Sequence, residues 1–202
     1  SQAGKISAGR LIQAKGRDYS VKTLLGGNSE QAAIFENGDF ATLYLSPRDY
    51  HRIHMPCQGR LLETTYVPGR LFSVAPHTTR AIPNLFARNE RLVTLFETPA
   101  GPVALIMVGA IFVSCMETVW GGTVNPSMGM QLQLQHTRHD QPEDTLIERD
   151  RGDEMGRFNM GSTEILLFGQ DRIEWDPLLQ PGSAVQLGQQ IARLAGASHA
   201  GE

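Results

Sequence analysis

The residues whose types and spacing could do chemistry are Gly161-Ser162-Thr163 and two histidines, His51 and His54. Gly161 can adopt backbone angles that other residues avoid, and Ser162 places a hydroxyl beside its own amide bond. Attack of this hydroxyl on the carbonyl carbon of Gly161 would convert the amide into an ester. The alternative is a tight turn before a strand, which these three residues taken alone favour.

The two histidines lie in a short segment between Pro47 and Pro56, which we expect to connect two strands. His51 and His54 would share a face if the segment makes one helical turn. No third or fourth zinc ligand is obvious nearby, so a metal site is not expected. Acid–base chemistry fits better, because imidazole accepts and returns a proton near neutral pH. Two histidines that only bond the local backbone remain an equal alternative.

Composition limits the function classes. The chain has 202 residues, 41% of them hydrophobic and 19% charged, which is typical of one soluble globular domain. Its net charge of -3 gives no electrostatic case for nucleic acid. Cys57 and Cys115 lack metal-ligand or disulfide-framework spacing and are expected to be buried thiols in a reducing compartment. No apolar run is long enough for a membrane span, and no signal peptide is visible.

Strands must position most of these residues. Alternating apolar residues with Gly and Pro turns between them predict strands over 40–45, 59–67, 91–97, 103–108, 165–168 and 173–175, with shorter ones at 71–74 and 82–86. We expect a hairpin around Ala8-Gly9, short helices over 20–25 and 29–35, and a closing strand before residue 194. The expected fold class is α+β, predominantly antiparallel β with a few short helices, in a single compact domain.

The segment 131–156 is polar and charged, and we expect an exposed loop with His136 and His139 in solvent. A loop just ahead of Ser162 is a place where the chain can be cut without losing core contacts.

Six motifs occur in a characteristic order: Tyr50-His51-Arg52-Ile53-His54-Met55-Pro56, Val67-Pro68-Gly69, Asn84-Leu85-Phe86-Ala87-Arg88-Asn89-Glu90-Arg91, Val108-Gly109-Ala110, Glu154-Met155-Gly156-Arg157-Phe158 and Gly161-Ser162-Thr163. Each motif is weak alone. The ordered set, from residue 5 to about residue 194, resembles the bacterial phosphatidylserine decarboxylase family.

The resemblance implies a catalytic domain over residues 1–202 that cuts itself between Gly161 and Ser162. Residues 1–161 would belong to the large β chain and residues 162–202 to the small α chain. Ser162 would become a covalent pyruvoyl group at the new amino terminus. That carbonyl would bind the amine of phosphatidylserine and act as electron sink while carbon dioxide leaves, giving phosphatidylethanolamine.

The resemblance also assigns roles. His54 matches the histidine of an Asp-His-Ser triad for self-cleavage, and His51 is the candidate for handling protons or the carboxylate during decarboxylation. The family's triad aspartate lies in a Pro-x-Asp-Gly motif just ahead of the position where this chain starts, and Asp49 is expected instead to cap its own segment. We therefore expect the chain to be part of a longer precursor, and residues 1–202 alone to stay uncut.

The implied partners are phosphatidylserine in a membrane surface and the large and small chains of one precursor; a homodimer is left open. The implied location is peripheral, on the cytoplasmic face of the bacterial inner membrane, with the membrane-binding amino-terminal region absent from this chain. Leu71-Phe72 and Leu85-Phe86 are candidates for an apolar substrate entrance, with burial in the core as the alternative.

Two other classes remain open. A serine hydrolase would use Ser162 and His54 as a lasting nucleophile and base, but Gly-x-Ser-x-Gly is missing. A non-catalytic biotinyl- or lipoyl-like binding module would explain the Gly-rich turns near the end. Such modules carry a lysine on a hairpin tip, and residues 173–194 contain none.

Overall fold

A computed structural model describes residues 1–14, 17–111, 116–124, 133–139, 146–158 and 162–196. The strands are β1 (Gln2–Lys5), β2 (Arg10–Ala14), β3 (Arg17–Ser20), β4 (Asp39–Leu45), β5 (Arg52–His54), β6 (Gly59–Val67), β7 (Arg91–Thr98), β8 (Gly101–Val108), β9 (Met116–Thr118), β10 (Gly122–Thr123), β11 (Gln135–Arg138), β12 (Glu148–Arg149), β13 (Glu154–Phe158), β14 (Ser162–Phe168), β15 (Ile173–Trp175) and β16 (Ala192–Leu194). The helices are α1 (Val21–Leu24), α2 (Ser29–Ile34), α3 (Pro76–Ala81) and α4 (Leu85–Arg88).

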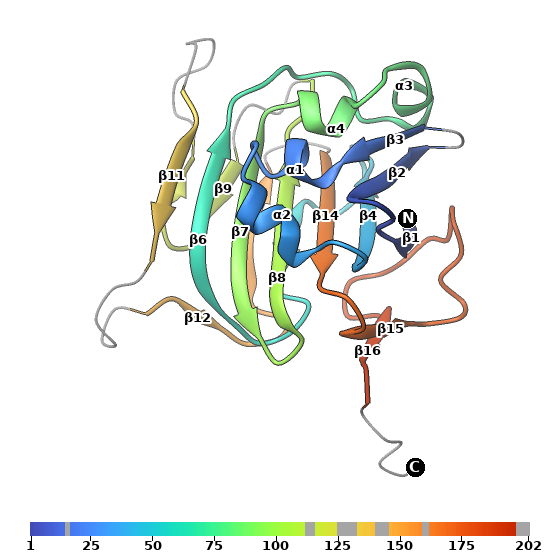
Figure 1. The fold of residues 1–202 in the computed structure, drawn as a ribbon. Helices are drawn as coiled ribbons and strands as arrows, with labels where there is room; N and C mark the ends of the chain where they lie inside the picture. Colours follow the sequence, from blue (N-terminus) through green and yellow to red (C-terminus); the bar gives the residue numbers. More distant parts are fainter. Residues whose placement is uncertain (15–16, 112–115, 125–132, 140–145, 159–161, 197–202) are drawn as a thin grey trace.

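Two antiparallel sheets form the body of the molecule (Figure 1). The large sheet has the strand order β1-β4-β14-β8-β7-β6-β11, with β12 also pairing with β6. The smaller sheet has the order β10-β9-β13-β5. Every strand pair in both sheets is antiparallel, which confirms the predicted fold class.

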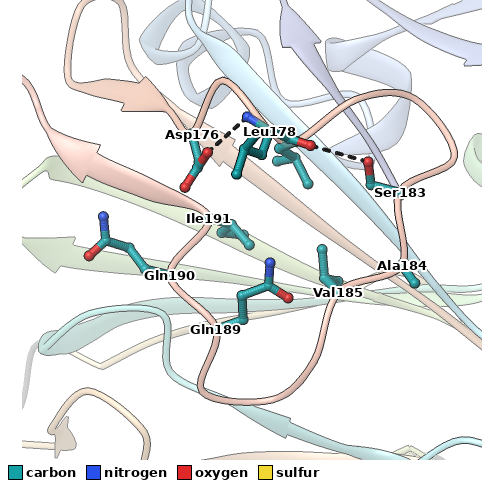
Figure 2. A pocket seen from close by; sticks show the side chains of 9 residues that line it. Asp176, Leu178, Ser183, Ala184, Val185, Gln189, Gln190 and Ile191 are labelled. Carbon is teal, nitrogen blue, oxygen red and sulfur yellow. Dashed lines mark hydrogen bonds between the residues drawn. The ribbon is translucent and has the colours of Figure 1, made fainter.

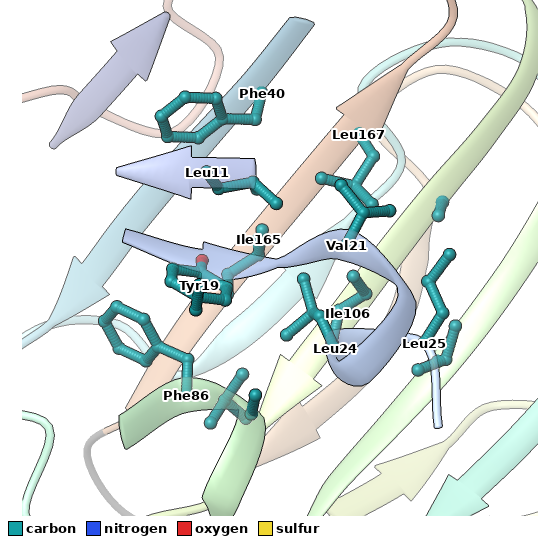
Figure 3. Packing of buried hydrophobic residues seen from close by; sticks show 14 of the residues in the cluster. Leu11, Tyr19, Val21, Leu24, Leu25, Phe40, Phe86, Ile106, Ile165 and Leu167 are labelled. Carbon is teal, nitrogen blue, oxygen red and sulfur yellow. The ribbon is translucent and has the colours of Figure 1, made fainter. Parts of the chain in front are cut away.

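β14 lies in the middle of the large sheet and is buried on both faces. Ile165 and Leu167 pack with residues of α1 and α4 on one face (Figure 3). Leu166 and Phe168 pack on the other face with residues of the smaller sheet. Burial on both sides explains why β14 reads as a continuous apolar run rather than an alternating one.

Most predicted strands are confirmed, because their turns carry local signals. The hairpin of β7 and β8 turns at Gly101, whose φ of 76° suits glycine. The predicted short helix before Gly26 is α1, capped by the Ser20 side chain. For α2 the N-cap is Asn28, one residue earlier than the predicted Ser29.

The predicted hairpin around Ala8-Gly9 is wrong in its pairing. Ala8 and Gly9 do form a turn with φ of 50° and 66°, closed by a single bridge between Ser7 and Arg10. Beyond that bridge, however, β1 pairs with β4 and β2 pairs with β3. The turn is local, whereas the choice of partner depends on distant strands.

The strands predicted at 71–74 and 82–86 are also wrong. The segment between β6 and β7 contains α3 and α4 instead, with Pro76 at the start of α3. The buried Asn89 side chain bonds both backbone groups of Phe72 and the carbonyl of Gly109, with distances of 2.8–3.0 Å. An apolar run this short does not distinguish helix from strand.

Within the segment 131–156, the residues of β11 are exposed, as predicted for the segment. The segment is nevertheless not simply a loop. β11 and β12 both add to the edge of β6, and β13 begins within the segment. His136 and His139 are also not simply solvated. Their ring nitrogens lie 2.8 Å from the hydroxyl of Thr65 and 2.9 Å from that of Thr64, respectively.

Candidate active site

The first residue of β14 is Ser162, whose backbone pairs with Leu45 at the end of β4. Gly161, on the other side of the predicted cleavage bond, lies outside the described residues. Thr163 follows between Tyr44 and Val108 and is fully buried, and its hydroxyl has no hydrogen-bond partner in the described chain. The predicted cleavage position therefore lies where a central strand begins, not on a surface turn.

After Leu45 the chain turns through residues 46–51 toward β5. The Asp49 carboxylate accepts a hydrogen bond from the backbone N–H of Ser46 at 2.7 Å, and the backbone N–H of Asp49 donates to the Ser46 carbonyl at 2.9 Å. These bonds to Ser46 lower the pKa of Asp49. Asp49 thus holds its own turn, as expected, and offers no triad geometry.

His51 anchors the other end of the same region. Its carbonyl accepts a hydrogen bond from the backbone N–H of Phe158 at 2.9 Å. Phe158 is therefore held by His51, and Ser162 is held by Leu45. Both ring nitrogens of His51 are buried, and neither has a hydrogen-bond partner among the described residues.

His54 has both ring nitrogens engaged. Nδ1 lies 2.7 Å from the Gly152 carbonyl, which can only accept, so Nδ1 carries the proton. Nε2 lies 3.0 Å from the Tyr50 hydroxyl and accepts from it, while the Tyr50 and His54 rings stack with centroids 5.6 Å apart. Nε2 is therefore the basic atom of His54.

The helical turn that would have put both histidines on one face does not form. Residues 52–54 form β5, and alternation along a strand sends residues three apart to opposite faces. The two imidazoles have different surroundings: that of His51 bonds no residue in the described ranges, while that of His54 bonds Tyr50 and Gly152.

β13 positions both histidines through backbone hydrogen bonds, because it pairs with β5 and ends at Phe158, which bonds the His51 carbonyl. Its pairing with β5 shifts register between Glu154, opposite His54, and Gly156, opposite Ile53. Such a bulge re-aims the side chains around it. A Cβ on Gly156 would lie 2.5 Å from the backbone oxygen of Glu117 on β9, so only glycine lets the two strands approach this closely.

Glu164 is a polar group at this end of β14 that the sequence interpretation missed. It is 8% exposed, and burial raises the pKa of its carboxyl to about 8. The available signal was a glutamate directly before the apolar run 165–168. An acid at one strand position is, however, equally compatible with an exposed face of the sheet.

Other candidate residues lie elsewhere. Leu85 and Phe86 are buried in the core, so the entrance predicted for them is wrong, whereas Leu71 and Phe72 are half-buried. Cys57 is also half-buried, and its burial raises the pKa of its thiol. The described ranges contain no cluster of three or more His, Cys, Asp or Glu that could hold a metal ion.

A cavity of about 270 Å³ lies under the loop between β15 and β16 (Figure 2). Its rim is held by hydrogen bonds from the Leu178 N–H to Asp176 at 2.8 Å and from the Ser183 hydroxyl to the Leu178 carbonyl at 3.4 Å. None of the candidate residues at the start of β14 lines it.

Comparison with known proteins gives consistent matches. The family profile described as phosphatidylserine decarboxylase matches residues 1–193. The phosphatidylserine decarboxylase proenzyme of Pseudomonas putida is 51% identical over 195 residues, covering 96% of this chain and 67% of that protein. The proenzyme of Nitrosococcus oceani is 53% identical over 196 residues, covering 96% and 62%. That of Shewanella frigidimarina is 51% identical over 195 residues, covering 96% and 67%. The chain thus spans about two thirds of the length of these relatives.

Proposed function

The chain belongs to the phosphatidylserine decarboxylase family, and from that premise we propose that it is the catalytic part of a pyruvoyl-dependent carboxy-lyase. Its substrate would be phosphatidylserine and its product phosphatidylethanolamine. The observation that carries the proposal is the imidazole of His51, whose buried ring nitrogens bond no described residue, while the carbonyl of the same residue accepts a hydrogen bond from Phe158, four positions before Ser162.

In the proposed maturation, the Ser162 hydroxyl attacks the Gly161 carbonyl and converts the amide into an ester. Elimination from the ester leaves dehydroalanine, which takes up water and releases ammonia to give the pyruvoyl group. Nε2 of His54 is the atom that would accept the serine proton, because Nδ1 is bonded to the Gly152 carbonyl. The hydrogen bond from Tyr50 must open for this, since it occupies the same nitrogen.

The proposed cofactor at residue 162 is a small carbonyl group. A pyruvoyl group supplies an electrophilic carbonyl for the substrate amine and an electron sink for the leaving carboxylate. The ring nitrogens of His51 can each donate or accept a hydrogen bond, and no described residue takes either. They are therefore available to a carboxylate or a proton of the substrate. Buried apolar residues of both clusters pack against the two faces of β14 beyond this end.

The two alternative functions have less support. A hydrolase would need Ser162 to survive as a nucleophile, and the relatives are named proenzymes of a decarboxylase. A carrier module would need a modified lysine, which residues 173–194 lack.

We propose a peripheral location on the cytoplasmic face of the bacterial inner membrane, with phosphatidylserine drawn from the bilayer surface. None of the helices in the described ranges is long and apolar enough to cross a bilayer. Two observations support this location: the phospholipid in the relatives' name, and a basic surface formed by the exposed Arg70, Arg80 and Arg88.

The test uses the full-length protein that contains this chain. We expect two chains on a denaturing gel, and mass spectrometry should place a pyruvoyl group at residue 162. Reduction with cyanoborohydride in the presence of phosphatidylserine should leave a substrate adduct on that peptide. His54→Ala should slow or stop cleavage, whereas His51→Ala should cleave but lose at least about 100-fold in turnover. Ser162→Ala serves as the uncut control.

An acyl adduct on an intact Ser162 would instead support the hydrolase. Absence of any adduct from cleaved wild-type protein would overturn the proposed decarboxylase.

A further inference from the structure

Glu164 lies two positions after Ser162 in β14, directly between Leu43 on β4 and Met107 on β8. Alternation along the strand puts Glu164 on the same face as Leu166, which packs toward the smaller sheet. Two residues along a strand span about 6.6 Å, so the carboxyl group of Glu164 begins within side-chain reach of residue 162.

The carboxyl group has no polar partner among the residues that the structure describes. It makes no hydrogen bond or ion pair with any described residue, and its direct neighbours across the strands are apolar. β13 lies close to this position, because Gly156 of β13 approaches Met107, the residue paired with Glu164. A Cβ at this glycine would lie 3.3 Å from Sδ of Met107.

The charged groups on the neighbouring strands are already paired away from it. On β13, Arg157 bonds Glu117 of β9 at 2.6–2.8 Å, and Glu154 bonds Arg52 of β5 at 2.6 Å. β4 and β8 contribute one described acid, Asp39, which lies at the far end of β4 and bonds Lys5. Just before β5 lies His51, a titratable group whose buried ring nitrogens bond no described residue.

A buried acid with no partner makes a poor structural group, because an apolar side chain of the same size would be more stable there. Such groups concentrate at functional sites. With its pKa raised to about 8 by burial, Glu164 holds its proton at neutral pH, unlike an exposed carboxyl. It can therefore act as a donor in a dry site.

We propose that Glu164 is the acid that delivers a proton to the substrate carbon from which carbon dioxide has left. The role rests on the proposed function. The bond between this carbon and the carboxylate breaks, carbon dioxide leaves, and the electron pair stays behind. The carbon takes the proton of Glu164, and water returns one proton to the carboxylate. Each turnover thus consumes one proton from solution.

The test compares Glu164→Gln, which keeps the size but has no acidic proton, with Glu174→Gln, which removes an exposed acid on β15. Both are made in the full-length protein. We expect Glu164→Gln to cleave itself and to give the cyanoborohydride adduct like wild type, but to turn over at least about 100-fold more slowly. Wild-type activity should fall above pH 8, and this alkaline fall should be absent from the residual activity of Glu164→Gln.

A second readout does not depend on turnover. In the uncut Ser162→Ala protein, the infrared band of a protonated carboxylic acid should lose intensity as the pH rises through about 8. The same band should be missing from the double variant that carries both Ser162→Ala and Glu164→Gln. Turnover of Glu164→Gln within twofold of wild type at every pH would overturn the proposal while leaving the decarboxylase intact. If wild type itself forms no substrate adduct, the proposed function fails, and the role of Glu164 fails with it.

Discussion

At the scale of single residues, three polar side chains near the start of β14, His51, Thr163 and Glu164, form no hydrogen bond with any described residue. Buried polar groups are nearly always hydrogen-bonded, so each exception calls for an explanation. A packed strand end has no structural use for three of them. Thr163 and Glu164 directly follow the predicted cleavage position in the chain, and the His51 carbonyl bonds Phe158 shortly before it. A substrate with a carboxylate, an amine and a phosphate would offer them partners.

The protonation of Glu164 predicts how stability changes with pH. Burial raises its pKa from 4.5 to about 8, so between these values the folded chain holds a proton that the unfolded chain has released. Stability therefore falls as the pH rises through this window, by up to about 1.4 kcal/mol per pH unit, and is independent of this group below and above it. Urea unfolding at pH 5, 6, 7 and 8 measures this.

The comparison is between the protein with Glu164 and the variant Glu164→Leu. Both proteins also carry Ser162→Ala, which keeps the chain uncut. The stability gained by Glu164→Leu should grow steadily from pH 5 to pH 8. A gain that stays constant with pH would mean that Glu164 ionises as an ordinary exposed acid.

Sequence alone proposed Ser162, His51 and His54, because the motifs behind the family resemblance are local in the chain, and their roles stay predictions. It missed Glu164, since what makes this glutamate unusual is the absence of partners on strands far away in sequence. It left open whether the two histidines share a face, because a segment bounded by prolines does not reveal whether it is helical or extended.

At the scale of elements, β13 connects the site to the rest of the molecule. It pairs with β5, which carries His54, and with β9, and it ends at Phe158, which is bonded to the His51 carbonyl. Close packing of β13 on β9 depends on Gly156, where any Cβ would meet the Glu117 backbone. A shift of β13 would thus displace both histidines.

We predict that Gly156→Ala destabilises the protein by about 1–3 kcal/mol, the usual effect of overpacking, and slows self-cleavage at Gly161-Ser162. Gly4→Ala is the matched control, because a Cβ there would make an ordinary contact of 3.4 Å with the Phe40 ring. Urea unfolding and a time course of cleavage on gels measure the two effects. Normal cleavage by Gly156→Ala would mean that β13 does not position the site.

Elements with local signals were the predictable ones. The β7–β8 hairpin and α1 follow from turn residues and a capping serine. The pairing of β1 with β4, and of β11 with β6, could not be predicted, since nothing within a strand specifies a partner 38 or 71 residues away, as for Ala3 with Ala41 and His136 with Thr65.

At the scale of the whole molecule, charge is unevenly distributed. The chain has a net charge of -3, yet residues 64–89 contain three arginines and no acidic residue. All three, Arg70, Arg80 and Arg88, are exposed, and none forms an ion pair within the described part of the chain. The backbone N–H of Arg70 bonds the Arg88 carbonyl at 2.8 Å, so these two share one surface.

This basic surface lies near the start of β14. Val108 pairs with Thr163, and the next residue, Gly109, accepts a hydrogen bond from Asn89, the neighbour of Arg88. Figure 1 shows α3 and α4 at the end of the sheet where β14 begins, with β15 and β16 at the opposite end. The half-buried Phe72 under the Arg88 guanidinium, 4.8 Å from its ring centroid, adds an apolar component.

A lipid substrate requires the site to face the bilayer, and we predict that this surface docks on anionic lipid. Basic side chains near an anionic bilayer contribute about 1 kcal/mol each, so Arg70→Gln with Arg80→Gln should weaken binding of the full-length protein to phosphatidylglycerol vesicles roughly tenfold or more. Added salt should reduce the difference, because it screens the charges. Vesicle sedimentation measures both effects.

The control is Arg172→Gln with Arg193→Gln, which removes the same charge at the opposite end of the molecule, beside β15 and on β16. It should bind vesicles like wild type. Turnover of a short-chain phosphatidylserine dissolved in detergent should be unchanged in both double variants, since neither pair touches the proposed reacting groups. Equal weakening by the two pairs would show that net charge, not this surface, governs docking, and the orientation proposed here would then be wrong.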